Sequence, residues 1–482
     1  MKNKNDLIAN FITEQLEDIP NILNEELSFN QKKYNTRTEF DELTNHIKNF
    51  RDKNNTNRFI VLPGLRGVGK TTLLYQIYEY LLSQKINPNQ ILYLSCEQLN
   101  NITEYNITDV LDIFLKTQHN TNIRLLDKEI YLLIDESQYS QNWALSGKII
   151  YDKSKNVFMI FTGSSALNLE NNADAARRMI KNEITPLNYS EHLKLKYNIN
   201  IEKLSKILRN ILFNQKINQI SECERKINNT LINNQAYTSN DWNDYFKFGG
   251  FPTYFKEKNH RILLKKIVDM TERVINVDMT NIKNFTIDNQ INANRLLRYL
   301  SLQRSSDVSQ VKLSKELNTP QSNIKNILNT LEKTHLIYHL EAYGTSTKRI
   351  SKPYKYYFAT SSIKNALSTI TGNTMKNTSE YEGILLENLV ASTLNNIKKQ
   401  ENHYFTIYYD SNKKNNVDFL LQEEFKNPIP LEVGRGKKDK KQIKYAMNYY
   451  DSPYGIIVSN TTFNIEKEDD IIYIPPKTFS YL

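Results

Sequence analysis

Gly64-Leu65-Arg66-Gly67-Val68-Gly69-Lys70-Thr71-Thr72 is the stretch that decides the fold of this 482-residue chain. It matches the P-loop pattern in full, because four residues separate its first glycine from the Gly-Lys-Thr triplet. An apolar run at 58–62 precedes the loop, and a helix-patterned run at 73–82 follows it. This order of strand, glycine loop and helix predicts a site for nucleotide phosphates and makes a chance match in a glycine turn the weaker interpretation.

Each part of the loop has a physical role in binding phosphate. Glycines let backbone N–H groups turn toward the anion, and the N-terminus of the following helix adds partial positive charge. Lys70 is placed to reach the β and γ phosphates, and the Thr71 hydroxyl can ligate magnesium. Arg66 can contact a phosphate or a partner, and the sequence leaves both roles open. We therefore predict that residues 64–72 hold ATP with Mg²⁺.

Tyr131-Leu132-Leu133-Ile134-Asp135-Glu136 is an apolar run that ends in two carboxylates. This pattern is typical of a Walker B strand, in which Asp135 holds magnesium through water and Glu136 polarises the attacking water. A carboxylate pair at this position can also be a helix cap. The P-loop upstream favours the catalytic interpretation and predicts an ATPase.

Two further polar groups follow the next apolar run, 157–161. Phe161-Thr162-Gly163-Ser164-Ser165 ends that run, and we predict Ser164 as the sensor of the γ-phosphate, with a serine-capped turn as the alternative. Arg177 and Arg178 come later, and a guanidinium from the same or a neighbouring subunit can complete such a site. Arg178 is the preferred candidate, and a solvent-exposed arginine is the alternative.

The length of the chain and its patterns predict several domains. Alternating strand and helix signals predict an α/β fold in which helices wrap a parallel sheet. The predicted parts are an N-terminal helical lead-in at 1–36, a P-loop core at 37–187, a helical lid at 188–290, a winged helix-turn-helix at 291–360 and a C-terminal α/β domain at 375–482. Within the lead-in, a helical pattern at 7–27 is predicted to be interrupted at Pro20.

Composition and charge limit the partners, the cysteine chemistry and the cellular compartment that we expect. A net charge of +10 permits a polyanionic partner such as DNA and is equally compatible with simple solubility. Two cysteines cannot form a disulfide framework or a cysteine-based zinc site. The first 35 residues lack an apolar signal region, and no apolar stretch reaches the roughly 18 to 20 residues of a membrane span. We expect a cytoplasmic protein that does not cross a membrane.

The predicted winged helix contains a helix at 311–317, a break at Asn318-Thr319-Pro320 and a second helix at 321–331. Six apolar residues are predicted to face inward: Leu313, Leu317, Ile324, Ile327, Leu328 and Leu331. The outward residues of the second helix suit phosphates and base edges: Gln321, Ser322, Asn323, Lys325 and Asn326. Lys348, Arg349 and Lys352 are predicted to form a basic wing. Protein binding is the alternative role of such a domain.

Across residues 37–482 the chain resembles prokaryotic AAA-type ATPases, frequent in archaea, with a C-terminal domain of unknown function similar to the restriction-endonuclease fold. The resemblance is carried by the P-loop, Leu133-Ile134-Asp135-Glu136, Thr162-Gly163-Ser164-Ser165, Arg178 with Pro186-Leu187, and Gly249-Gly250-Phe251-Pro252. The Gly-Gly-Phe-Pro stretch resembles a lid element of that family. A glycine usually precedes the family's arginine, whereas here the order is Ala176-Arg177-Arg178, so the resemblance leaves the acting arginine open.

The resemblance to the endonuclease fold implies a second metal site at Glu387, Asp418 and Glu432. Gly434 stands where the fold's lysine is expected, and that lysine helps to activate water in active enzymes. Lys437 or Lys438, or alternatively Gln442 and Lys444, are candidates to replace it. A nuclease, a nucleic-acid-binding relic and a structural domain all stay open.

Three functions follow as hypotheses. The first is an ATP-hydrolysing switch or machine that acts on or near DNA as a homo-oligomer. The second is an ATP-gated, magnesium-dependent DNA nuclease. The third is a signalling or scaffold ATPase whose winged helix binds protein.

Overall fold

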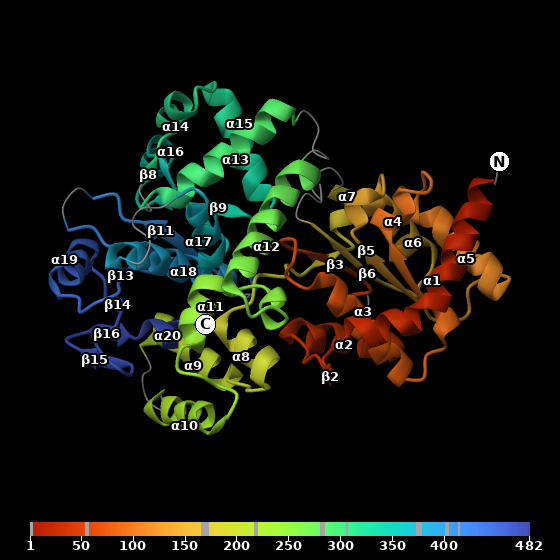
Figure 1. Ribbon diagram of the computed structural model, residues 1–482, viewed down its shortest axis with the longest axis horizontal. Coiled ribbons are helices and arrows are strands. Elements are labelled where there is room, and N and C mark those ends of the chain that lie inside the picture. The colour runs from red at the N-terminus through yellow and green to blue at the C-terminus, as the bar shows by residue number, and fades with distance from the viewer. Residues whose placement is uncertain are drawn as a thin grey trace. The chain divides into compact units, whose positions relative to one another are not determined.

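The structure is a computed structural model, shown as a ribbon in Figure 1. It describes residues 3–53, 57–164, 173–215, 220–279, 285–304, 307–372, 378–400, 404–412 and 415–482. Within these residues the chain forms two compact units, Met1–Thr185 and Pro186–Leu482, which are called unit 1 and unit 2 below. Each unit is described by itself.

Unit 1 is built on a five-stranded parallel sheet in the order β4-β5-β6-β3-β7. Its strands are β3 (Phe59–Pro63), β4 (Ile91–Ser95), β5 (Ile130–Asp135), β6 (Val157–Gly163) and β7 (Ile180–Lys181). The strands β3 to β6 are buried along their whole length, which explains their continuous apolar sequences. The register sets Ser95 beside Asp135 and Pro63 beside Gly163, so these strands end at one edge. This sheet matches the P-loop fold predicted from the sequence.

Helices cover both faces of the unit 1 sheet, as the ribbon shows (Figure 1). They are α1 (Lys4–Glu26), α2 (Thr38–Arg51), α3 (Lys70–Ser83), α4 (Cys96–Asn100), α5 (Ile107–His119), α6 (Trp143–Lys153) and α7 (Ala173–Ala176), with a short hairpin of β1 (Ser28–Phe29) and β2 (Lys32–Lys33) after α1. The predicted interruption at Pro20 is wrong, because α1 runs through it. Ile8, Phe11 and Ile12 anchor this helix in the core of unit 1, and that packing compensates for the backbone hydrogen bond missing at proline.

Unit 2 begins with a run of helices and continues as a mixed α/β structure. The helices are α8 (Tyr189–Tyr197), α9 (Glu202–Asn214), α10 (Ile220–Asn233), α11 (Asp241–Phe248), α12 (His260–Arg273), α13 (Ile287–Leu302), α14 (Gln310–Leu317), α15 (Gln321–Lys333), α16 (Ser346–Ser351), α17 (Ser361–Ile370), α18 (Ser379–Gln400), α19 (Lys441–Tyr450) and α20 (Pro476–Phe479). A π-helical turn, Val274–Asp278, extends α12. The early helices share one apolar core with the C-terminal strands, since Leu208, Leu212, Ile456 and Ile472 are buried together.

One nine-stranded sheet runs through the rest of unit 2, in the order β15-β16-β14-β13-β12-β11-β9-β10-β8. Its strands are β8 (Asp307–Val308), β9 (Ile337–Ala342), β10 (Tyr354–Phe358), β11 (Phe405–Tyr409), β12 (Phe419–Glu423), β13 (Ile429–Gly434), β14 (Gly455–Ser459), β15 (Glu466–Glu468) and β16 (Ile471–Ile474). The parallel pairing of β9 with β11 joins the predicted winged-helix strands to those of the predicted C-terminal domain. Nothing in the local sequence patterns indicated this continuity.

The close packing of α6 on β3 generates a stability prediction. A Cβ atom added to Gly147 on α6 would lie 2.2 Å from Cζ of Phe59, which is fully buried. Gly147→Ala should therefore lower the free energy of unfolding by about 1–3 kcal/mol through overpacking. In α18, a Cβ on Gly383 would meet nothing within 4 Å, so Gly383→Ala should raise it by about 0.5–1 kcal/mol.

Urea unfolding of the full chain, followed by far-ultraviolet circular dichroism, measures both changes. Equal midpoints for the wild type and Gly147→Ala would show that the contact between α6 and β3 is looser than described.

Candidate functional site

The P-loop connects β3 to α3 and is folded as phosphate binding requires. Gly67 and Gly69 adopt positive φ angles of 83° and 98°, a region that side chains disfavour. The first helical residue of α3 is Lys70, which is buried, and its ammonium donates to the carbonyl oxygens of Gly64 at 2.8 Å and Leu65 at 3.1 Å. The lysine side chain therefore folds over the loop, and its ammonium is bound by the loop's own carbonyl oxygens.

The first glycine of the loop is required for a different reason. A Cβ on Gly64 would lie 2.3 Å from the carbonyl oxygen of Ile184. The chain after β7 runs along β3 to this point, since the amides of Asn182 and Ile184 donate to the carbonyls of Val61 and Pro63 at 3.0 and 2.8 Å. The last residues of unit 1 thus lie directly against the P-loop.

Asp135 ends β5 and its carboxylate is enclosed by hydroxyl groups. Thr71 donates to one oxygen at 2.8 Å, Tyr93 donates to the same oxygen at 3.3 Å, and Thr162 donates to the other. Burial and the neighbouring Glu136 raise the pKa of Asp135, while the hydrogen bonds from Thr162 and Thr71 oppose that rise. The predicted magnesium ligands Thr71 and Asp135 are therefore in direct contact.

Glu136 follows Asp135 in a left-handed conformation, with φ of 51°. Its backbone amide donates to the Thr162 hydroxyl at 3.2 Å, and the Gln138 side chain donates to its carboxylate. The carboxylate is half-buried, so water can reach it. The left-handed turn places Glu136 at the carboxyl edge of the sheet, directly after Asp135. Its role as general base stays a prediction.

Ser164 lies just beyond the end of β6 and is 2% exposed, and its hydroxyl has no hydrogen-bond partner within the described residues. A buried hydroxyl without a hydrogen-bond partner is suited to bind a ligand. The sensor role of Ser164 is consistent with this observation and stays a prediction. The neighbouring Ser165 lies outside the described residues.

The two candidate arginines differ in their contacts. Arg178 donates to the carboxylate of Asp152 at 2.6 Å and to the carbonyl of Asp174 at 2.8 Å. Arg177 is exposed at the surface of unit 1. Within the loop, Arg66 and Thr72 are half-buried. The role of either arginine at the nucleotide stays a prediction.

Sequence reasoning did not identify Tyr93 as a residue of this site, and it placed Thr162 at the end of its strand without assigning it a contact. Both belong to the strands that flank β5, and both contact Asp135. The signal was present in the register of a parallel sheet, because polar residues near the carboxyl ends of adjacent strands meet at one edge. Their positions became apparent only with the strand order.

The three C-terminal carboxylates come from different elements of unit 2 and interact electrostatically. Glu387 on α18 accepts a hydrogen bond from Tyr357 at 2.8 Å, and Asp418 accepts one from the amide of Val433 at 2.7 Å. Burial, together with the charge of Asp418, raises the pKa of both Glu387 and Glu432. The sequence thus identified three acids that the fold brings into one charged cluster.

Lys438 reaches back to this cluster, as one of the sequence alternatives proposed. Its ammonium lies 2.5 Å from Oε1 of Glu432, and its Cε atom passes 2.2 Å from where a Cβ on Gly434 would stand. Glycine at 434 therefore makes room for a lysine supplied by the following loop. Gln442 and Lys444 form hydrogen bonds elsewhere, to the Asn416 carbonyl and to Asp469.

Nowhere in the described ranges do three or more His, Cys, Asp or Glu side chains form a group that could hold a metal.

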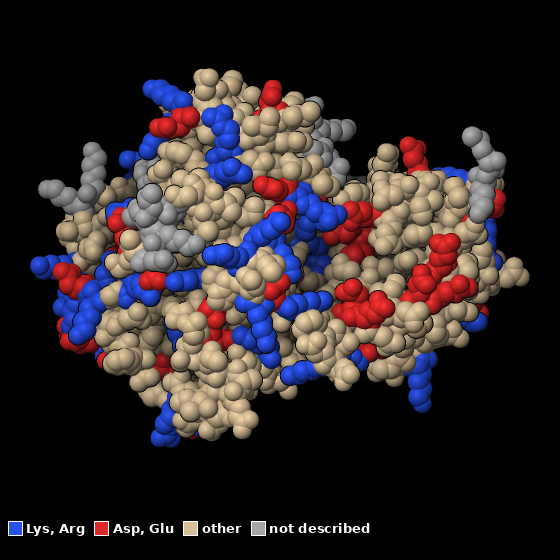
Figure 2. Space-filling view, in the orientation of Figure 1, with Lys and Arg blue, Asp and Glu red and all other residues tan. Residues whose placement is uncertain are grey.

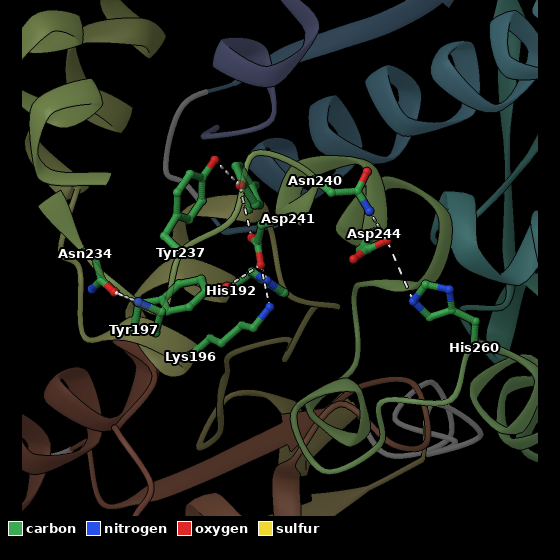
Figure 3. Close-up of polar contacts among 11 residues, drawn as sticks. His192, Lys196, Tyr197, Asn234, Tyr237, Asn240, Asp241, Asp244 and His260 are labelled. Carbon is green, nitrogen blue, oxygen red and sulfur yellow. Dashed lines mark hydrogen bonds and ion pairs between the residues drawn. The ribbon is translucent and has the colours of Figure 1, made fainter. Parts of the chain in front are cut away.

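A second buried polar network, around Asp241, was not predicted (Figure 3). The Asp241 carboxylate accepts from Tyr189 at 3.1 Å, from Tyr197 at 2.6 Å and from Lys196, and Nε2 of His192 lies 3.3 Å away. Burial opposes ionisation of Asp241, yet these partners lower its pKa overall. The carboxylate is almost fully enclosed by its partners, so the network fixes α8 to α11.

In the predicted helix-turn-helix, α14 and α15 place the residues as their pattern suggested. All six predicted inward residues are buried: Leu313, Leu317, Ile324, Ile327, Leu328 and Leu331. All five predicted outward residues of α15 are exposed: Gln321, Ser322, Asn323, Lys325 and Asn326. The predicted wing contains α16, where Arg349 donates to the Gly344 carbonyl and lies over the Tyr408 ring, and Lys352 follows it, exposed. Lys and Arg side chains are frequent over the visible face of unit 2 (Figure 2).

Comparison with known proteins identifies the family. An uncharacterized protein of Methanocaldococcus jannaschii, MJ1637, is 32% identical over 482 residues, which cover all of this chain and 95% of that protein. The chain belongs to the family of this archaeal protein. A second protein of the same organism, MJ1544, is 27% identical over 397 residues, covering 80% of this chain and 77% of that one.

Family descriptions match three segments of the chain. Residues 56–193 match the AAA domain, residues 239–374 match a domain of unknown function (DUF8612), and residues 382–479 match another (DUF4143). Residues 56–193, most of which lie in unit 1, thus form an AAA-type P-loop ATPase domain, and this match supports nucleotide binding. The ORC2 protein of Aeropyrum pernix, solved as ADPNP–ADP complexes, aligns with 73% of this chain and 98% of its own at 11% identity, with a TM-score of 0.37.

Within the residues of this chain that the structure describes, no helix is both long enough and apolar enough to cross a membrane.

Proposed function

We propose that this AAA-domain protein binds ATP together with Mg²⁺ and hydrolyses the nucleotide. The observation that carries the proposal is the hydroxyl-lined carboxylate of Asp135, which meets Thr71 at 2.8 Å beside the turn that holds Glu136. Oxygen donors are the ligands that magnesium prefers, and a hydroxyl in contact with a carboxylate supplies two of them. The residues present therefore fit the ion.

The residues of unit 1 divide the chemistry among themselves. Lys70 leaves the Gly64 and Leu65 carbonyls for the phosphates, and Thr71 and Asp135 are the residues that would hold magnesium, which would supply charge neutralisation at the transferred phosphoryl group. Glu136 orients the attacking water and accepts its proton. Ser164 donates its hydroxyl to the γ-phosphate, and Arg177 or Arg178 completes the site from the same or a neighbouring subunit.

The central test is the substitution of the general base. Glu136→Gln keeps the shape of the side chain and removes its basicity, so ATP affinity should stay within about threefold while turnover falls by about 10²–10³-fold. Steady-state phosphate release and binding of a fluorescent ATP analogue measure the two effects.

Glu129→Gln is a matched control, because Glu129 directly precedes the other end of β5 and its carboxylate accepts a hydrogen bond from Tyr131 at that end of the strand. Turnover in this control should stay near the wild-type rate. Wild-type turnover in Glu136→Gln would show that another group acts as the base.

We further propose that unit 2 acts on or near DNA through α14 and α15, arranged as a winged helix-turn-helix. The support is the order α13, β8, α14, α15, β9, α16 and β10, with β10 paired to both β8 and β9. Helix α15 presents polar and basic side chains on one exposed face while its apolar residues are buried. Such a face can enter a major groove.

Removal of two exposed lysines, Lys325 on α15 and Lys352 directly after α16, tests the proposal. Lys325→Gln with Lys352→Gln should reduce the slope of log affinity against log salt by about 1 for each phosphate that the protein no longer neutralises. Fluorescence anisotropy with a labelled duplex, titrated at several salt concentrations, measures this slope.

Lys206→Gln with Lys226→Gln removes the same charge from α9 and α10, where both lysines are exposed and paired with Glu202 and Glu222. This control should leave the slope unchanged. Absence of DNA binding at low salt would favour the alternative, in which the same domain binds protein in a signalling or scaffold ATPase.

For the nuclease alternative, we infer that the C-terminal carboxylate cluster does not cleave nucleic acid. Lys438 reaches the place of the fold's lysine, but its ammonium is paired with Glu432, and the charge of Lys355 acts on Glu387 and Asp418. The acids and lysines of the cluster are therefore engaged with one another. Within the described residues, these acids also form no ligand group of the kind that metal-dependent cleavage requires. These observations support a domain similar to the endonuclease fold that has the three acids and does not catalyse cleavage of nucleic acid.

Plasmid DNA incubated with the protein, Mg²⁺ or Mn²⁺, and ATP should stay supercoiled. Asp418→Asn is the control for contaminating nucleases, since the amide keeps the shape of the half-buried carboxylate. Nicking by the wild type that disappears in Asp418→Asn would contradict the inference.

A further inference from the structure

Arg37, which directly precedes α2, donates hydrogen bonds to two segments at once, the P-loop and the last residue of unit 1. The residue is 5% exposed. One guanidinium nitrogen, Nη1, donates to the carbonyl of Val68 in the P-loop at 2.8 Å. Another, Nη2, donates to the carbonyl of Thr185, the last residue of unit 1, at 3.0 Å. The planar guanidinium therefore holds the loop and the end of the unit in one fixed geometry.

Glu39 locks this guanidinium in place. Its two carboxylate oxygens accept from Nε and Nη2 of Arg37, both at 3.1 Å, and Glu39 is itself 8% exposed. A buried, bidentate pair of this kind is shaped for orientation, because the fork fixes the plane of the guanidinium as well as its position. Loss of either partner would leave a buried charge without compensation.

The contact with Val68 orients the P-loop backbone. In a trans peptide the carbonyl and the next N–H point in opposite directions. Arg37 holds the Val68 carbonyl, and so the N–H of Gly69 points away from Arg37. Gly69 directly precedes Lys70 and Thr71, so this amide belongs to the set that faces the phosphates in a P-loop.

The contact with Thr185 reaches the start of unit 2 through the chain itself. Pro186 follows Thr185, and the amide of the next residue, Leu187, donates to the Gly250 carbonyl at 2.9 Å. Tyr245 donates to the Leu187 carbonyl at 3.0 Å. The Gly-Gly-Phe-Pro stretch, to which the sequence assigned no chemistry, is thus the turn that receives this segment within unit 2.

That turn is built to hold one conformation. Gly250 has a φ of 94°, and a Cβ there would lie 2.8 Å from Cγ2 of Thr360. The Ser362 hydroxyl donates to the Gly249 carbonyl at 2.6 Å, and the Ser361 hydroxyl donates to the Phe246 carbonyl at 2.6 Å. A displacement of Leu187 would therefore act on α11 and α17 together.

We propose that Arg37 is a positioning residue that couples the nucleotide state of the P-loop to unit 2 through Thr185, Pro186 and Leu187. The coupling rests on the proposed ATP binding. When Lys70 leaves the Gly64 and Leu65 carbonyls for phosphate, the loop changes where it touches Ile184 and where Arg37 holds Val68. Arg37 passes that change to the Thr185 carbonyl, one residue before unit 2 begins.

Hydrogen exchange of the full chain, with and without a non-hydrolysable ATP analogue, tests the coupling. In the wild type, saturating analogue should change exchange at the Leu187 amide by about threefold or more. Arg37→Met should weaken analogue binding by about tenfold, because it removes charged hydrogen bonds. At saturating analogue, this variant should lose the exchange response at Leu187.

Arg37→Lys provides a second variant that keeps the charge. A lysine cannot form the fork, so this variant should also lose the response while retaining more of the fold's stability. Arg51→Met, at the other end of α2 and partly exposed, is the matched control and should respond like the wild type. A response at Leu187 in Arg37→Met or Arg37→Lys equal to that of the wild type would overturn the proposal.

Measurements on the wild type distinguish a failure of the coupling from a failure of ATP binding. If the wild type binds the analogue and its Leu187 exchange does not change, coupling is wrong and ATP binding stands. If the wild type binds no analogue, ATP binding itself is wrong.

Discussion

The buried carboxylate of Asp135 is the constraint on which the ATPase unit depends. A carboxylate at 4% exposure is costly unless hydrogen-bond donors surround it, and its donors come from β4, β6 and the first turn of α3. To bring Tyr93, Thr162 and Thr71 to one point, the strands must lie in the order β4-β5-β6 and their carboxyl ends must coincide. The same requirement places the P-loop beside Glu136. Fold and candidate chemistry in unit 1 therefore share one cause.

The P-loop is constrained on its outer side as well. Gly64 packs against the Ile184 carbonyl, and Arg37 holds Val68 together with Thr185. The chain then enters unit 2 by way of Leu187, which is hydrogen-bonded to the Gly-Gly-Phe-Pro turn. The loop that faces phosphate on one side is thus attached on the other side to the segment that leaves the domain. This arrangement suits a protein in which nucleotide acts on a second part of the chain.

Local sequence patterns predicted much of the fold because the relevant signals are local. The P-loop, the apolar strands of unit 1 and the helices α14 and α15 each depend on spacing within about ten to twenty residues. The predicted break at Pro20 failed because packing of Ile8, Phe11 and Ile12 outweighs the missing hydrogen bond. Propensity is a weak guide wherever tertiary contacts decide.

The remaining features depend on pairings between distant residues, which one sequence does not reveal. The nine-stranded sheet requires β9 to meet β11, and the Arg37 contacts span 31 and 148 residues. Lys438 was one of several candidates to replace the lysine missing at Gly434. Only the structure shows that its side chain passes over Gly434 and reaches Glu432. The Asp241 network likewise joins helices that the sequence treats separately.

The most direct measurement of the central claim is a calorimetric titration of ATP into the wild type and Asp135→Asn, each with Mg²⁺ and with EDTA. The wild type should bind ATP more tightly with Mg²⁺ than with EDTA, by about tenfold or more, because Thr71 and Asp135 hold the ion. Asp135→Asn should lose most of that difference. Equal wild-type affinities in the two buffers, or an undiminished difference in Asp135→Asn, would contradict the account.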